Sequence, residues 1–158
     1  MTPAGSIEGL AIAKAMRENL WLYPSVEIVH IAGFVILVGS VLMFDLRVLG
    51  ISKQVPVRGL ARHLLPWSLA ALVLIVPSGL AMFAAHANDF IANRAFQLKM
   101  ALLLAAGMNA AIFHTGPYRT VAEWDTGVAA PLGARVSVAF SIAIWFSIIA
   151  CGRLLAYL

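Results

Sequence analysis

The chain has few charged residues. Only 11% of its 158 residues are charged, while 62% are hydrophobic. A soluble globular domain has about 25% charged residues and about 45–50% apolar residues. A chain with so little polar surface cannot cover a water-soluble globule. The composition therefore predicts an integral membrane protein, and the length predicts one domain over residues 1–158.

Cysteine and catalytic motifs are also scarce. A single cysteine, Cys151, excludes an intrachain disulfide, and its apolar surroundings predict a packed thiol. There is no C-x-x-C-H segment for covalent haem attachment, no zinc-type cysteine spacing, no phosphate-binding glycine loop and no nucleophile elbow. The net charge is +4, but the basic residues flank apolar runs, where they anchor a chain to lipid headgroups. Nucleic acid is therefore not an expected partner.

Long apolar runs are what the chain does have. There are four, over residues 26–48, 64–85, 96–114 and 136–156. Each is close to the ~20 residues that cross about 30 Å of hydrocarbon as a helix. Runs this long without two-residue alternation indicate helices and not strands. The sequence predicts an all-α fold, an antiparallel four-helix bundle that spans the membrane.

Two further features of the helices follow from local sequence. Apolar side chains over residues 6–20 favour one side of a helix, which predicts an N-terminal amphipathic helix in the membrane interface. Pro66 is expected in the first turn of the second span, where a missing N–H is harmless. Pro77 lies deep in that span and is expected to kink it.

Four histidines lie near the ends of the apolar runs: His30 and His86 toward one membrane face, His63 and His114 toward the other. The second and third spans run antiparallel, so His63 and His114 are expected to meet. Such a pair suits bis-imidazole ligation of haem b, with Arg62 and Arg119 neutralising the propionates. The alternative interpretation is that these two histidines are interfacial and hydrogen-bond lipid headgroups or water.

A second polar layer is expected at the opposite face. Glu27 and His30 are three residues apart, so they share one side of a helix, and Lys99 begins the third span at a comparable depth. One interpretation is a ligand or proton-exchange site in which His30, with or without His86, binds iron or another metal and Glu27 orients it. The other is a buried Glu27–Lys99 ion pair between helices, with His30 donating a hydrogen bond. For His86, the alternative is a solvated loop histidine.

Three more polar residues lie in or beside the spans. Asp45 and Arg47 close the first span and point to different sides. A salt bridge from Asp45 to Arg62 or Arg119 is the favoured interpretation, and proton uptake by Asp45 is the alternative. Asn109 is an isolated amide in the third span, and it predicts an interhelical hydrogen bond.

Taken in order along residues 20–155, several short motifs resemble a widespread group of bacterial four-helix membrane proteins, catalogued mainly as a domain of unknown function. The motifs are Pro24-x-x-Glu27-x-x-His30, Phe44-Asp45-Leu46-Arg47-Val48-Leu49-Gly50, Arg62-His63-Leu64-Leu65-Pro66-Trp67, and Phe96-Gln97-Leu98-Lys99 with Asn109. The pattern is also similar to the copper-resistance protein D family and to the membrane protoporphyrinogen oxidase family, which binds haem b. These resemblances imply functional roles for His30 and Lys99 and a location in the bacterial inner membrane.

The functional expectation is a haem b-binding membrane protein that relays electrons, with a quinone and a partner subunit as the candidate redox partners. Any enzymatic activity would be that of a membrane oxidoreductase. Two alternatives remain open. One is a transporter of copper or a small solute that uses His30, Glu27 and methionines. The other is a structural subunit of a larger membrane complex. Membership of an oligomer or complex is expected in each case.

Overall fold

The computed structural model describes residues 3–155, and it is helical with no strand in that range, which confirms the all-α expectation. Four helices are long and apolar enough to cross a membrane: α3 (Leu22–Leu49), α4 (Val57–Ala85), α6 (Arg94–Thr115) and α7 (Leu132–Leu154). Four short helices complete the described chain: α1 (Pro3–Glu8), α2 (Ala11–Glu18), α5 (Ala87–Ala92) and the 3₁₀ helix η1 (Pro117–Glu123). The protein is a multi-pass membrane protein with the expected helical bundle.

The ends of the long helices have local causes. Gly50 has a φ of 114°, which suits glycine, and the Ile51 N–H bonds back to the Leu46 carbonyl as α3 ends. Asn93 caps α6, because its side-chain oxygen accepts from the N–H groups of Ala95 and Phe96. Each cap satisfies backbone groups that a helix end would otherwise leave without partners.

Two local predictions are corrected. Helix α4 begins at Val57, so Pro66 lies in its interior and not in its first turn. The loop before α4 is short and tied down, which lets the helix start earlier than the apolar run does. At the N-terminus, residues 6–20 do not form one helix: α1 ends at Glu8 and α2 begins at Ala11. Gly9 lies at the break, where its high conformational entropy disfavours helix.

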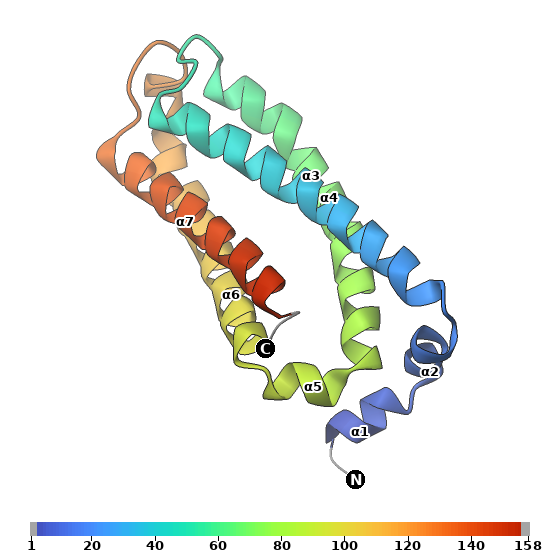
Figure 1. Ribbon diagram of the computed structural model, residues 1–158. Helices are drawn as coiled ribbons and strands as arrows, with labels where there is room; N and C mark the ends of the chain where they lie inside the picture. The colour runs from blue at the N-terminus through green and yellow to red at the C-terminus, as the bar shows by residue number, and fades with distance from the viewer. Residues whose placement is uncertain (1–2, 156–158) are drawn as a thin grey trace.

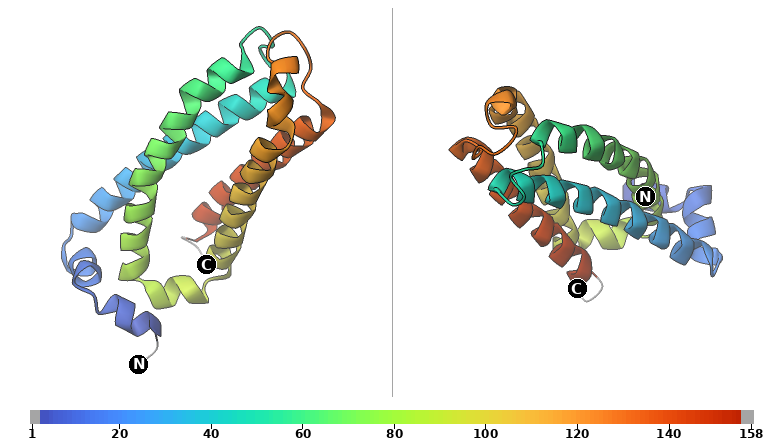
Figure 2. Two further views of the ribbon diagram at one scale, coloured as in Figure 1. Left: turned by 180° about the vertical axis from the view of Figure 1, so that it is seen from behind. Right: turned by 90° about the horizontal axis from the view of Figure 1, so that it is seen from above.

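The long helices form two antiparallel pairs, α3 with α4 and α6 with α7 (Figure 1). The two pairs contact each other through α3 and α7, whereas α4 and α6 do not pack against each other. The pairs converge at the end that carries the α3–α4 and α6–α7 connections and diverge toward the end bridged by α5, as both views of Figure 2 show. This divergence leaves space between α4 and α6.

A network of hydrogen bonds joins the pairs at the convergent end. The Val57 N–H donates to the Asp125 carbonyl at 3.0 Å, and the Gly127 N–H donates to the Lys53 carbonyl at 2.9 Å. The Arg47 side chain, only 3% exposed, donates to the carbonyls of Val55, Lys53 and Asp125. One buried guanidinium therefore ties together two loops that belong to different helix pairs.

The outer faces of the long helices are apolar and exposed. Val73 and Leu104, for example, are each 71% exposed. Lipid tails are as apolar as these side chains, so the outer faces need no protein partner in a bilayer. The interior packing is provided by a buried cluster of α3, α4 and α7 side chains that includes Leu37, Trp145 and Ile148.

The N-terminal helices are clamped onto the corner between α4 and α5. The Arg17 guanidinium donates to the carbonyls of Ala85 and Glu8, and the Glu8 carboxylate accepts from the Asn88 N–H at 2.8 Å. Met16 of α2 is 2% exposed against this corner. The amphipathic segment is therefore held by protein contacts on one side, while Leu20 and Trp21 stay exposed.

This clamp is expected to weaken in acid. The hydrogen bond from the Asn88 backbone N–H lowers the pKa of Glu8 below its ordinary value of 4.5. A lowered pKa in the folded state gives stability above the unfolded pKa, and that stability is lost as the pH falls through the folded pKa. The protection of α1 and α2 against hydrogen exchange, relative to the intrinsic exchange rate at each pH, should therefore fall as the pH drops below 4.5, the ordinary pKa of Glu8. Glu8→Gln should exchange faster at neutral pH and lose the pH dependence; equal profiles for the two proteins would contradict the clamp.

Candidate functional site

A cavity of about 1350 Å³ lies between the two helix pairs. Small-molecule pockets in proteins are about 300–1,000 Å³, so this space is large enough for a large cofactor or a lipid-soluble molecule. Most of its lining is apolar, and the side chains come from α3, α4, α5, α6, α7 and η1. Polar side chains gather at its two ends, and these ends are the candidate sites.

At the divergent end, His30 of α3 faces α4. Its Nδ1 lies 3.1 Å from the Ile75 carbonyl oxygen and 3.0 Å from Ser78 Oγ. A Cβ on Gly79 would lie 3.1 Å from His30 Cε1, so glycine at this position makes room for the ring. His30 also lines the cavity. The imidazole is therefore fixed on one edge by α4 and is half-buried at the cavity wall.

Lys99 of α6 lines the same cavity from the other helix pair. Its Nζ is 3.9 Å from the position that a Cβ on Gly152 would take, so the side chain extends along α7. His30 and Lys99 therefore line one cavity from α3 and α6. The predicted layer thus brings together an imidazole and an ammonium group on opposite walls.

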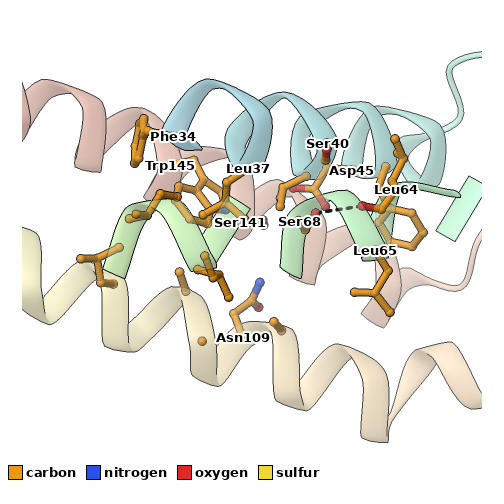
Figure 3. Close-up of a pocket in the computed structure, with 18 of the residues that line it drawn as sticks. Phe34, Leu37, Ser40, Asp45, Leu64, Leu65, Ser68, Asn109, Ser141 and Trp145 are labelled. Atoms are coloured by element: carbon orange, nitrogen blue, oxygen red, sulfur yellow. Dashed lines mark hydrogen bonds between the residues drawn. The ribbon is translucent and has the colours of Figure 1, made fainter. Parts of the chain in front are cut away.

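At the convergent end, Asp45 of α3 is 3% exposed and lines the cavity. It lies in a layer with the hydroxyl-bearing side chains Ser40, Ser68 and Ser141, as Figure 3 shows. Its buried Oδ2 has no hydrogen-bond partner among the described residues. The predicted salt bridge to Arg62 or Arg119 is not formed.

Next to Asp45 is a group of aromatic rings, hereafter the ring cluster: Phe44, Phe113, His114 and Tyr118. The rings of Phe44 and Phe113 have centroids 5.6 Å apart, and those of His114 and Tyr118 are 5.1 Å apart. All four residues line the cavity. Hydroxyl, carboxyl and aromatic groups therefore share this end.

The predicted site residues divide into two sets. Those that line the cavity are His30, Lys99, His114, Arg62 and Arg119. His63 is exposed on α4 and is not among the cavity-lining residues, so it does not share a site with His114. His86 packs against Tyr23 and Phe90 and lies 3.7 Å from Asp89, outside the cavity. The expected bis-imidazole arrangement is therefore not formed.

Other expected contacts in this set are also not formed. Glu27 is exposed on α3, and among the described residues it makes no ion pair with Lys99. In residues 3–155 there is no group of three or more His, Cys, Asp or Glu side chains placed to hold a metal ion. Cys151 is buried, as its apolar neighbours indicated.

Sequence reasoning missed the residues that support the sites. Ser78 and Gly79 position His30, yet neither was assigned a role. A small signal existed, because Ser78 and Gly79 interrupt an apolar run directly after Pro77. The ring cluster had no signal, since its members come from three separate segments.

Comparison with known families supports the resemblance to a group catalogued as a domain of unknown function. Residues 22–158 match a family of unknown function, DUF6644. The chain belongs to this family. The match begins at the first residue of α3 and includes all four long helices, so the family is defined by the membrane-spanning part. No curated protein and no solved structure matches the chain.

Asn109 confirms its predicted role between helices. Its Nδ2 donates to the Ser137 carbonyl at 3.1 Å, and the Ser137 hydroxyl donates to its Oδ1 at 2.9 Å, which joins α6 to α7. Asn109→Leu should lower the free energy of unfolding in detergent by about 1–2 kcal/mol. Ser137→Ala should cost less, because the backbone carbonyl remains as an acceptor. Equal stability of wild type and Asn109→Leu would contradict this role.

Proposed function

We propose that the protein is a haem b-binding membrane protein of the bacterial inner membrane that relays electrons, and that His30 would bind the haem iron. The observation that supports this best is how the His30 ring is held. A carbonyl oxygen can only accept, so the contact between Nδ1 and the Ile75 carbonyl requires a proton on Nδ1. In the neutral ring, Nε2 then carries the free lone pair that iron requires.

This arrangement is typical of metal-binding histidines. Such a residue nearly always donates its second ring N–H to a carbonyl, carboxylate or water, which fixes the tautomer and orients the ring. For His30, the Ile75 carbonyl and the Ser78 hydroxyl provide this second contact. His114 lacks a comparable anchor among the described residues, since its recorded contacts are ring contacts with Phe113 and Tyr118.

The cavity has the size and polarity for such a group. It is mostly apolar, and Lys99 provides a cationic group opposite His30 that would neutralise a propionate. When bound, haem would supply one-electron chemistry between ferric and ferrous iron. The resemblance of His30 and Lys99 to their counterparts in the haem-binding oxidase family favours the same assignment. A quinone and a partner subunit are the proposed electron donor and acceptor.

An absorption spectrum tests the proposal. The protein, expressed with ample haem, should purify with a Soret band that sharpens on reduction. His30→Ala should lose the band. His63→Ala is the matched control, because this histidine is exposed and outside the cavity, and it should keep the band. Lys99→Met should weaken haem retention without abolishing it.

Other outcomes would favour the alternatives. A colourless wild-type protein would overturn the haem proposal. Copper that copurifies and is lost in His30→Ala would instead support a copper carrier. A colourless, metal-free protein that purifies only with neighbouring subunits would support a structural role in a larger complex.

A further inference from the structure

We infer that the convergent end of the cavity binds a lipid-soluble hydroquinone, whose ring packs in the ring cluster and whose hydroxyl donates to the Asp45 carboxyl group. This site is separate from His30: Asp45 is fifteen residues along the same helix, or about 22 Å at 1.5 Å per residue. The binding step does not depend on haem. Only the passage of electrons from the hydroquinone would rest on the proposed function.

The first support is the state of Asp45. A carboxyl group at membrane depth is costly unless it has a partner, and such residues mark functional sites. Asp45 is 3% exposed, has no ion pair and has one oxygen without any hydrogen-bond partner among the described residues. Buried acceptors without partners are rare in native proteins. An ionised carboxylate only accepts hydrogen bonds, so in that state the missing partner is a donor, and Asp45 lines the cavity from which a donor would come.

The second support is the ring cluster. Phe44 is adjacent to Asp45 in sequence, and its ring contacts those of Phe113 and Tyr118. Aromatic side chains arranged edge-to-face around a site favour an aromatic guest, because their rings interact best with another π system. An acceptor without a partner beside four aromatic side chains fits a ring that carries a hydroxyl group.

The third support is the route into the site. Helices α4 and α6 do not pack against each other, and the residues that line the cavity between them are mostly apolar. A molecule dissolved in the bilayer can therefore enter between these helices, and its tail can remain there. Neighbouring atoms cover Asp45 Oδ2, so the ring hydroxyl must displace side chains of this layer to reach it.

Ligand binding tests the inference without any mutation. The probes are a short-tailed ubiquinol, kept reduced, and its dimethyl ether, which has the same ring but no hydroxyl donors. Fluorescence of Trp145, which lines the cavity, reports occupancy, and Trp145→Phe identifies its share of the signal. The ubiquinol should bind at least about tenfold more tightly than the ether, as expected for a hydrogen bond to a carboxylate. Equal affinities would overturn the inference.

A variant then tests the residue. Asp45→Leu should bind the ubiquinol at least about tenfold more weakly and should no longer distinguish it from the ether. Glu123→Gln, an exposed carboxyl group on the same side of the membrane, should behave as wild type. If Asp45→Leu still prefers the ubiquinol, Asp45 is not the acceptor. Tailless hydroquinone should bind more weakly than the tailed form; equal binding would indicate a water-soluble phenol and overturn the lipid-soluble class.

The two proposals can fail separately. A protein that has no Soret band but still binds ubiquinol more tightly than its ether would contradict the haem assignment and support this site. A protein that has the Soret band but binds both compounds equally would support the haem assignment and contradict this site.

Discussion

Arg47→Met should lower the free energy of unfolding by about 3–5 kcal/mol, the largest effect expected from any single change in this chain. The substitution keeps most of the side-chain volume and removes every donor. Three carbonyl groups, those of Val55, Lys53 and Asp125, would lose their hydrogen bonds to a buried cation. A hydrogen bond to a charged group contributes about 1.5–3 kcal/mol, but the three bonds share one side chain and are not additive, so the expected loss is smaller than their sum.

The effect of Arg47→Met should extend beyond the loop next to Arg47. The three carbonyls belong to the α3–α4 connection and to the segment between η1 and α7, so Arg47 links the two helix pairs. Without it, hydrogen exchange should rise in both connections together. Arg62→Met is the matched control, since Arg62 is exposed at the same end of the protein. If unfolding in detergent micelles shows the same loss for both variants, Arg47 does not join the pairs.

Asp45→Leu should raise the thermal unfolding temperature, by an amount equivalent to about 1–3 kcal/mol. The wild-type protein buries a carboxyl oxygen that has no hydrogen-bond partner, and leucine of similar size removes this cost. The surrounding side chains Leu37, Leu64 and Trp145 can pack against it.

The sign of the stability change shows whether Asp45 has a structural role. Removal of a buried polar residue usually destabilises a protein when the residue has a structural partner. An increase in stability together with weaker ubiquinol binding would mean that Asp45 is retained for function at a cost in stability. The control is Asp89→Leu, whose side chain is 83% exposed and which should change little. A lower unfolding temperature for Asp45→Leu would reveal a structural partner and contradict the stated cost.

The helix spans and several polar contacts were predictable because they depend on local composition. The lengths of the apolar runs predicted all four long helices. Asn109 was expected to form an interhelical hydrogen bond because an amide group in hydrocarbon needs a partner. The spacing of Asp45 and Arg47 correctly placed them on different sides of α3: one lines the cavity and the other holds the loops.

The histidine pairing failed for a physical reason. Nearly every face of these helices is apolar, so hydropathy does not tell which face turns toward the bundle. His63 and His114 end antiparallel helices at the same membrane face, yet α4 turns His63 outward while α6 turns His114 to the cavity. The predicted salt bridge of Asp45 was wrong for the same reason. The partners of a side chain depend on how its helix is rotated about its own axis, whereas the apolar runs predict only how deep in the membrane the residue lies.

By itself, the sequence determined that this chain crosses a membrane four times as helices and at which depth each polar residue lies. Only the tertiary structure decided which polar residues face one another. The reason is that the rotation of each helix is set by contacts between distant segments: the carbonyls bound by Arg47, the close approach of Gly79 to His30, and the pairing of Asn109 with Ser137. Helices α4 and α6 do not pack against each other, and the cavity on which both proposals depend lies between the two pairs.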